Sequence, residues 1–176
     1  MAFHKPRRVV VSRVRQGGAA TVFELLPREF QGWFAVGRLD KDSEGLLLFC
    51  NDSRLAQRLM DPGGVPKTYL VTVGGYPRDE DLAPIRSGGL MVAGRPSLPA
   101  EVCHVGRAPR GGTRFEVVLR EGRNREIRRL FFAAGFKVRR LVRTSVGPAS
   151  LGDLPSGETR ELDPEMVTTL RGLADS

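Results

Sequence analysis

Residues 37–51, GRLDKDSEGLLLFCN, set a charged segment directly against an apolar one. The continuous apolar run at 46–50 is typical of a strand that is buried on both faces. The polar residues before it, which end in Gly45, are typical of a tight turn or loop. A buried strand would therefore hold a charged loop in place, which is how scaffolds commonly position reactive side chains. We expect this loop to hold the functional site.

Length and composition indicate one domain that is not tied to a membrane. The chain has 176 residues, enough to bury a core of its own. No apolar stretch approaches the roughly 20 residues of a membrane helix, and the N-terminus lacks the apolar core of a secretion signal. We therefore expect a cytoplasmic protein. Cys50 and Cys103 fit no metal-binding or redox spacing, so we expect two small core residues in a reducing compartment and no disulfide.

The positive charge is concentrated in one segment. Residues 104–143 contain twelve Lys or Arg and three acids, a balance of +9, so the rest of the chain sums to −1 within the total of +8. Such clustering is typical of a protein that binds a polyanion, most often nucleic acid. A basic surface that is merely solvated is the alternative that charge alone leaves open. Because few aromatic residues accompany the arginines, a charged groove is favoured over a stacking platform.

Hydrophobic patterns predict strands and helices in irregular alternation. Strands are predicted at 9–11, 33–36, 46–50, 67–73, 114–119 and 137–146, with short ones within 88–105. Helices are predicted at 22–26 after a Thr21 cap, at 54–60, at 79–86, from an Asn124 cap to 134, and at 163–173. Several loops are too short for a parallel crossover. We predict an α+β fold over residues 1–176, with a mixed, largely antiparallel central sheet, flanking helices and room for two lobes around a basic cleft.

The acidic residues of the opening stretch partly match a calcium-binding loop. Residues 40–45, DKDSEG, fit its first half. The twelfth position, where such a loop needs Glu, is Asn51, and residues 46–49 offer no oxygen donors. Calcium is therefore disfavoured, and we expect no metal.

Other chemistries leave few candidates. Two carboxylates of the 40–45 segment would suit glycoside hydrolysis, but nothing else marks a sugar-binding groove. Glycine-rich phosphate loops are absent, and His4 and His104 are isolated from any nucleophile. We therefore predict a reaction without a cofactor that uses carboxylates, Tyr69 and arginines.

Three segments occur in order: GRLDKDSEGLLL at 37–48 followed by ND at 51–52, KTYLV at 67–71, and EGRNREIRRL at 121–130. They resemble the catalytic signature, the tyrosine strand and the C-terminal arginine motif of the RsuA/RluB/RluE/RluF family of ribosomal RNA pseudouridine synthases. HKP at 4–6 and TVFELLP at 21–27 are similar to the family's opening strand and following turn. The resemblance covers nearly the whole chain and implies the pseudouridine synthase catalytic fold.

Two departures from the family pattern are visible. Most members carry a small S4-type RNA-binding domain before the catalytic part, whereas this chain starts at about the Lys-Pro pair. We therefore expect a single catalytic domain without an S4 domain, closest to the RluE-like branch. The family often has glycine two residues after that proline, where this chain has Arg8.

The resemblance implies isomerisation of a uridine to pseudouridine in ribosomal RNA, expected in the large subunit. Asp40 would attack the target uridine so that the base detaches, rotates and rejoins through carbon. Tyr69 would lie against the uracil and help to move a proton. Arg128 would pair with Asp40, and an arginine there keeps a carboxylate ionised and aimed.

The resemblance also implies RNA contacts around these catalytic residues. Ile127 would pack against the base. Arg38 would enter the RNA helix where the uridine was, as base flipping requires. Further RNA-binding positions are Lys67, Arg123, Arg125 and Arg129.

Two other functions compete with the synthase. A non-catalytic module that binds ribosomal RNA during ribosome assembly would need the arginines, but not Asp40, whose charge repels phosphate. A carboxylate hydrolase would need a second acid about 5–10 Å from Asp40. We favour the synthase, with ribosomal RNA as its partner, either free or in an assembling large subunit, and a monomer as its working state.

Overall fold

A single mixed sheet organises the residues that the computed structural model describes, 1–62 and 64–175. Its strands are β1 (Ala2–Lys5), β2 (Phe34–Val36), β3 (Glu44–Cys50), β4 (Lys67–Val73), β7 (Glu101–Arg107), β8 (Thr113–Leu119), β9 (Val138–Val146), β10 (Ala149–Ser150) and β11 (Thr159–Arg160), with β5 (Met91–Val92) and β6 (Arg95–Pro96) in a separate hairpin. The helices are α1 (Val22–Leu25), η1 (Arg28–Phe30), α2 (Ser53–Arg58), α3 (Asp79–Ser87), α4 (Glu126–Ala133) and α5 (Pro164–Asp175). The predicted α+β class is confirmed.

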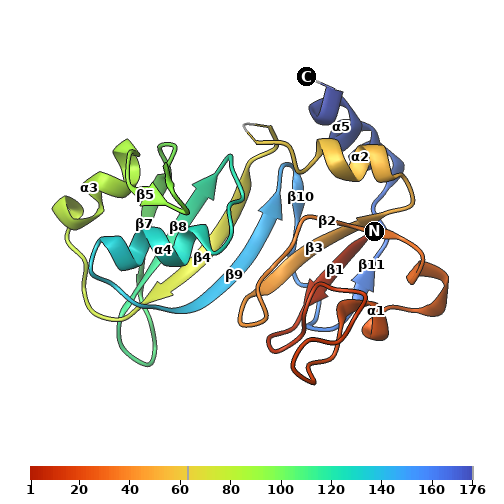
Figure 1. Cartoon of the computed structure of the whole chain (residues 1–176), viewed down its shortest axis with the longest axis horizontal. Coiled ribbons are helices and arrows are strands. Elements are labelled where there is room, and N and C mark those ends of the chain that lie inside the picture. The colour runs from red at the N-terminus through yellow and green to blue at the C-terminus, as the bar shows by residue number, and fades with distance from the viewer. Residues whose placement is uncertain (63, 176) are drawn as a thin grey trace.

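The sheet has two halves that meet at the pair of β3 and β9. The strand order is β11-β1-β3-β9-β4-β8-β7, with β2 also on β3 and β10 on β9 (Figure 1). Among the strand pairs of the described residues, β3 and β9 alone run parallel. The largely antiparallel sheet is therefore as predicted. No helix in the described ranges has both the length and the apolar character that crossing a membrane requires.

Gly45 allows the two halves to approach closely. It lies opposite Arg143 in the parallel register and has a φ of +109°. A Cβ atom at this position would overlap the backbone of Arg143. Glycine is therefore required here both by its φ and by the space available.

The core is divided between the halves. One cluster surrounds β4 and β8 under α3 and α4, and includes Phe115 and Phe131. On the other half, alternate residues of β3 enter different clusters, with Leu46 on one face and Leu47 on the other. The first of these clusters also includes residues of α2 and α5, and the second includes residues of β1 and α1. Strand β3 is buried on both faces, as its apolar run predicts.

The first strand differs from the prediction. It is Ala2–Lys5 rather than residues 9–11, of which Val10 makes only an isolated bridge with Thr21. Pairing with β3 buries Phe3 fully and joins the terminal amine of Met1 to the Phe49 carbonyl at 3.0 Å. Burial against a distant strand therefore decided the outcome over the local preference of three valines.

Helix α4 and one cysteine also correct the prediction. Asn124 does not cap α4, because the helix begins at Glu126 and its N-cap, Arg125, is left-handed with a φ of +53°. The Asn124 side-chain oxygen instead accepts a hydrogen bond from Arg129 at 3.3 Å. Cys103 is exposed on β7 and is not a core residue.

Arg8 occupies a backbone conformation that suits glycine. Its φ is +67°, and its N–H donates to the Lys41 carbonyl at 2.7 Å. A left-handed conformation costs a residue with a Cβ about 1–2 kcal/mol. The turn after β1 therefore requires the conformation that a glycine would adopt without strain.

We expect Arg8→Gly to raise the free energy of unfolding by about 0.5 kcal/mol, since relief of the left-handed strain exceeds the added entropy of the unfolded chain. Arg7→Gly is the matched control, because Arg7 is exposed and has an ordinary φ. That change should lower stability by about 0.5–1 kcal/mol. Urea unfolding of both variants measures the difference, and equal destabilisation of the two would contradict strain at Arg8.

Candidate active site

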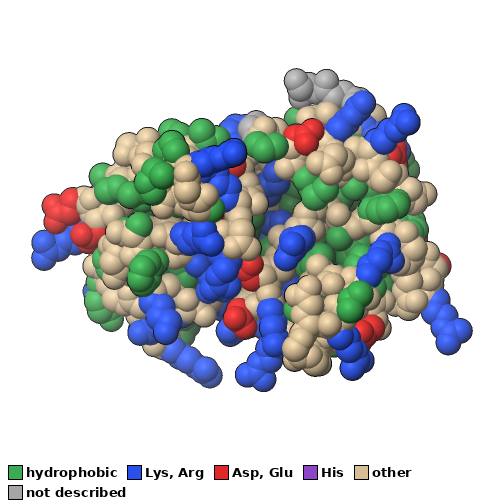
Figure 2. Space-filling view, viewed as in Figure 1, with side chains coloured by type: hydrophobic (Ala, Val, Ile, Leu, Met, Phe, Trp, Pro, Cys, Tyr) green, Lys and Arg blue, Asp and Glu red, His purple; other side chains and the backbone are tan. Residues whose placement is uncertain are grey.

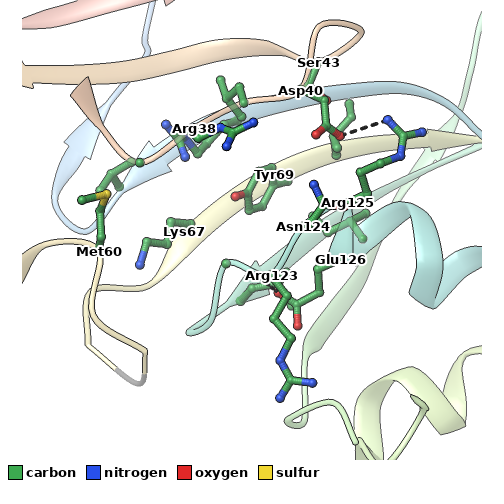
Figure 3. Close-up of a pocket in the computed structure, with 18 of the residues that line it drawn as sticks. Arg38, Asp40, Ser43, Met60, Lys67, Tyr69, Arg123, Asn124, Arg125 and Glu126 are labelled. Carbon is green, nitrogen blue, oxygen red and sulfur yellow. Dashed lines mark hydrogen bonds and ion pairs between the residues drawn. The ribbon is translucent and has the colours of Figure 1, made fainter. Parts of the chain in front are cut away.

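A pocket of about 320 Å³ lies where the two halves of the sheet meet. Figure 2 shows Lys and Arg side chains along the hollow between the halves. The pocket is formed by the loop before β3, by β4 and β9, and by the segment that leads into α4 (Figure 3). Its lining includes Arg38, Leu39, Asp40, Ser43, Met60, Lys67, Tyr69, Arg123, Asn124, Arg125, Glu126, Ile127 and Arg143.

The loop that carries Asp40 is held by a buried lysine. The Asp40 carbonyl accepts the N–H of Ser43 at 3.0 Å and so closes a turn. Lys5, whose side chain has no exposed surface, donates to the Ser43 carbonyl at 2.7 Å and to the Pro6 carbonyl at 2.9 Å. Burial lowers the pKa of Lys5 to about 8, and the nearby acids, chiefly Asp40, oppose that shift. Strand β1 thus fixes the loop from behind.

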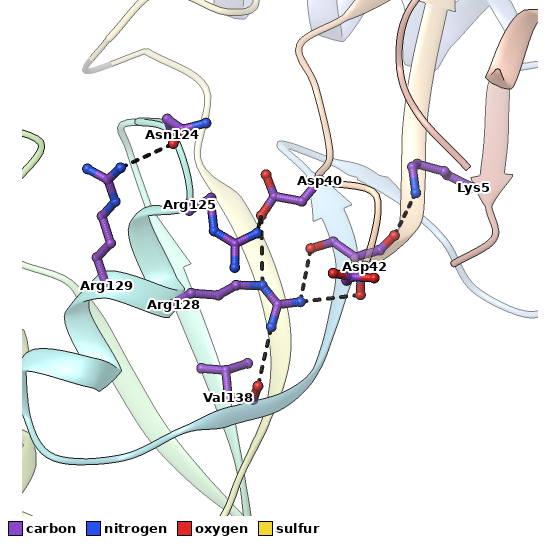
Figure 4. Close-up of polar contacts among 9 residues, drawn as sticks. Lys5, Asp40, Asp42, Asn124, Arg125, Arg128, Arg129 and Val138 are labelled. Carbon is purple, nitrogen blue, oxygen red and sulfur yellow. Dashed lines mark hydrogen bonds and ion pairs between the residues drawn. The ribbon is translucent and has the colours of Figure 1, made fainter. Parts of the chain in front are cut away.

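Two arginines approach the same oxygen of Asp40 (Figure 4). Arg125 Nη1 lies 3.4 Å from Asp40 Oδ2, and Arg128 Nε lies 3.7 Å from it. The sequence resemblance implies the pair of Arg128 with Asp40, whereas Arg125 is predicted only as an RNA contact. The Arg125 side chain is 47% exposed and that of Arg128 14%. Arg125 is therefore accessible from the pocket, while Arg128 supports Asp40 from within the protein.

Arg128 also ties three segments together. Its Nη2 donates to the Asp42 carbonyl at 3.2 Å and to Ser43 Oγ at 3.3 Å, and its Nη1 donates to the Val138 carbonyl at 3.3 Å. Burial, followed by the nearby charge of Arg125, lowers the pKa of Arg128. One guanidinium therefore links α4, the Asp40 loop and the start of β9.

Strand β4 supplies the opposite wall. Lys67 and Tyr69 are two residues apart, so both side chains lie on the same face of the strand. Both residues are buried and line the pocket. Figure 3 shows the Tyr69 ring between Lys67 and Asp40. The pocket thus has a carboxylate end and a cationic end, with an aromatic ring between them.

The cationic end of the pocket consists of two buried cations, Lys67 and Arg143. Arg143, which is buried, donates through Nε to the Leu46 carbonyl at 2.7 Å, and its Nη2 has no hydrogen-bond partner among the described residues. Burial, followed by the charge of Arg143, lowers the pKa of Lys67. In residues 1–62 and 64–175, neither cation forms an ion pair with a carboxylate. Because buried positive charges are costly when unpaired, this end of the pocket favours an anionic group on a ligand.

The segment before α4 places the remaining predicted residues differently. Ile127 is buried and lines the pocket. Arg123 lines it too, but its guanidinium pairs with Glu121 at 2.8 Å and donates to two carbonyls of the β5–β6 hairpin. Arg129 lies outside the pocket lining, with an exposed side chain that contacts Asn124. Arg38 lines the pocket with an exposed side chain.

Three residues near the site are not among those predicted from the sequence: Lys5, Arg143 and Glu126. Lys5 and Arg143 lie in strands that have other polar or charged residues, so the sequence gives no sign that these two are the ones enclosed. Glu126 is buried at the start of α4, where an acid usually faces solvent. Glu44, the first residue of β3, forms an ion pair with Arg140 on β9 at 2.8 Å. This contact joins two strands and does not involve Asp40.

A family model described as RNA pseudouridylate synthase matches residues 1–133. The chain belongs to this family. An uncharacterised RNA pseudouridine synthase of Mycobacterium bovis is 42% identical over 167 residues, which are 92% of this chain and 65% of that protein. A ribosomal large subunit pseudouridine synthase B of Haemophilus influenzae is 40% identical over 176 residues, which are 98% of this chain and 49% of that protein.

A solved structure agrees with this family assignment. The crystal structure of a pseudouridylate synthase superposes with a TM-score of 0.84 and 27% identity, over 96% of this chain and 72% of that one. The resemblance to the RsuA/RluB group of pseudouridine synthases is confirmed by relatives named synthase B. Placement in the RluE-like branch stays a prediction. The chain spans 65% of the length of the mycobacterial relative and 49% of the Haemophilus one.

Proposed function

We propose that the protein converts a specific uridine of large-subunit ribosomal RNA into pseudouridine. The observation that carries the proposal is the carboxylate of Asp40, held by two arginines in a pocket whose opposite wall is Tyr69. A volume of about 320 Å³ lies in the usual range for small-molecule sites. Relatives named ribosomal large subunit pseudouridine synthase B support this substrate class. We also propose that residues 1–176 form one catalytic domain, which acts as a monomer in the cytoplasm.

The reaction rearranges bonds within one nucleotide and needs no other reactant. Asp40 bonds covalently to the target nucleotide, and the base leaves with the electron pair of its bond from nitrogen to the sugar. The base turns and rejoins through a carbon atom, which loses a proton as the bond to Asp40 breaks. The nitrogen released from the sugar gains a proton, so the atoms balance. Tyr69 packs against the base and helps to move the proton.

The arginines and the cationic end of the pocket suit the rest of the nucleotide. Arg125 and Arg128 orient the Asp40 carboxylate. Lys67 and Arg143 supply the positive charge that a phosphate beside the target needs. Arg38, exposed at the pocket, takes the place that the flipped uridine leaves.

The test is to map pseudouridine in ribosomal RNA with and without the protein. Unmodified large-subunit RNA, either free or in partly assembled particles, is incubated with the purified protein, and pseudouridines are located at nucleotide resolution. We expect one new position, which is also missing from cells that lack the protein. Absence of any new pseudouridine in RNA and particles, with RNA binding intact, would instead favour the assembly module.

Removing two arginines of the C-terminal motif should weaken RNA binding and its salt dependence. For Arg125→Ala with Arg129→Ala, we expect the slope of log affinity against log salt to fall in magnitude by about one to two. Each phosphate contact that is removed means that fewer counterions are released when the RNA binds. The matched control is Arg15→Ala with Arg78→Ala, two exposed arginines outside the basic segment. Filter binding over a range of salt concentrations measures the slopes. A slope equal to that of the control would place the RNA surface elsewhere.

A further inference from the structure

Two carboxylates lie together, buried, beneath the turn that carries Arg125. Glu121 follows β8 and is 5% exposed, and Glu126 begins α4 and is 4% exposed. Glu121 Oε1 accepts the N–H of Leu98 at 2.9 Å, and its Oε2 pairs with Arg123 Nη2 at 2.8 Å. Glu126 Oε2 accepts the N–H of Arg123 at 2.9 Å. The two acids therefore share one arginine between them.

The contacts of Glu126 are those of a protonated acid. Its Oε1 is buried, and no donor in residues 1–62 and 64–175 faces it. The Glu121 carboxyl lies close enough to act on Glu126, and it can form a hydrogen bond with it once one of the two acids carries a proton. Two ionised carboxylates have no hydrogen to share, whereas a proton on Glu126 Oε1 donates to Glu121 and satisfies both groups. Burial, and after it the contact with Glu121, raises the pKa of Glu126 to about 8.

The pair is connected to the active site through the backbone. The Glu126 carboxyl holds the N–H of Arg123 across the turn, and Arg125 lies inside that turn in its left-handed conformation. From there Arg125 Nη1 reaches Asp40 Oδ2 at 3.4 Å. Figure 3 shows Arg123, Asn124, Arg125 and Glu126 grouped along one wall of the pocket. A change at Glu126 therefore moves the backbone that aims Arg125.

We propose that Glu126 is a positioning residue that works as a neutral acid, sharing one proton with Glu121, and that loss of this proton withdraws Arg125 from Asp40. The effect on turnover rests on the proposed synthase function, whereas the shared proton does not. With one proton, the pair carries a single negative charge beside Arg123. Without it, two buried like charges repel each other, and Glu126 leaves its contact with the Arg123 N–H.

Few other charged groups of the described residues lie near the pair of Glu121 and Glu126. The charged groups that act on Glu126 are Glu121 and Arg123. The β5–β6 hairpin, which packs against α4, presents backbone carbonyls to Arg123 and the segment after it presents the Leu98 N–H to Glu121. Burial raises the pKa of Glu121, but the contact with Glu126, the Leu98 N–H and the charge of Arg123 together lower it. The proton is thus shared between the two carboxyls, and Glu126 is the one whose pKa is raised.

The shared proton can be tested without any assay of activity. In the native protein we expect an infrared band of a protonated carboxyl that disappears on titration through about pH 8 and is absent from Glu126→Gln. The folded state retains this proton where the unfolded state has lost it, so native stability falls as the pH rises from about 4.5 to about 8. The advantage of Glu126→Gln should therefore grow across that window and then level off. The control is Glu116→Gln, the same change at an exposed site on β8.

The effect on turnover is tested by the dependence of the single-turnover rate on pH. Between about pH 7 and about pH 9 we expect native pseudouridine formation to fall about tenfold relative to Glu126→Gln, which keeps the neutral form throughout. At about pH 7 this variant should stay within about threefold of native, whereas Glu126→Ala loses activity at every pH because the Arg123 N–H loses its partner.

The outcomes separate the two claims. A parallel decline of native protein and Glu126→Gln would overturn the positioning role. Absence of the titrating infrared band from the native protein would overturn the shared proton, even if the variant failed to fold. Should the purified protein form no pseudouridine at all, the synthase function fails, while the band and the stability curves still decide whether the carboxyls share a proton.

Discussion

Asp40→Asn is expected to reduce pseudouridine formation by at least about a thousandfold, because an amide of the same shape cannot act as the nucleophile. The Asp40 side chain is 24% exposed, and its two arginine contacts lie at 3.4 and 3.7 Å, so their loss should change stability by less than about 1 kcal/mol. RNA affinity should hold or rise slightly, since a negative charge is removed near phosphate. Single-turnover rates and filter binding measure the two effects.

Asp42→Asn is the matched control for this variant. Asp42 lies on the same loop with an exposed side chain, and the loop uses its carbonyl rather than its carboxylate to contact Arg128. Its rate should remain within about threefold of native. Equal losses in the two variants would assign the effect to the charge of the loop, and a normal rate for Asp40→Asn would remove Asp40 from the mechanism.

Arg128→Met should impair both the reaction and the fold. The variant loses the contacts with Asp40, Asp42, Ser43 and Val138, and leaves two backbone carbonyls without their donor. We expect a loss of about 2 kcal/mol in the free energy of unfolding and a rate lower by about a hundredfold or more. Arg128→Lys keeps the charge but not the fork of donors, so it should recover part of the stability and little of the rate.

Chemical unfolding and single-turnover rates, measured below the unfolding midpoint, separate the two losses. Arg54→Met is the control, since Arg54 is an exposed arginine on α2 and should tolerate the change. A rate loss in Arg128→Met no greater than in this control would show that Asp40 needs only Arg125. Full recovery by Arg128→Lys would show that charge alone matters at this position.

Parts of the fold that depend on neighbouring residues could be predicted from the sequence. The apolar run of β3 indicates burial on both faces, and Thr21 caps α1 through its own side chain as predicted. The first strand could not be located in this way, because pairing with β3 outweighs the preference of residues 9–11 for a strand. The start of α4 was also missed. Asn124 is a good cap in general, but here Arg125 is the N-cap in a left-handed conformation, and Glu126 accepts the Arg123 N–H across the turn.

The candidate site shows the same limit. Asp40, Lys67 and Tyr69 could be identified from the sequence through a resemblance and the two-residue period of a strand. Lys5 and Arg143 could not, because their burial depends on carbonyls 38 and 97 residues away. No local pattern shows which charge of a basic protein will be enclosed by segments so distant along the chain.

Two register pairs among the described residues, Glu44 with Val142 and Gly45 with Arg143, join β3 to β9. Asp40 precedes β3 on one side of this junction, while Tyr69 on β4 and Arg128 on α4 belong to the other. A folding intermediate in which one half alone is native therefore contains the carboxylate or the phenol ring, but not both. During refolding, pseudouridine formation should therefore recover later than the secondary structure, because it requires both halves to be joined.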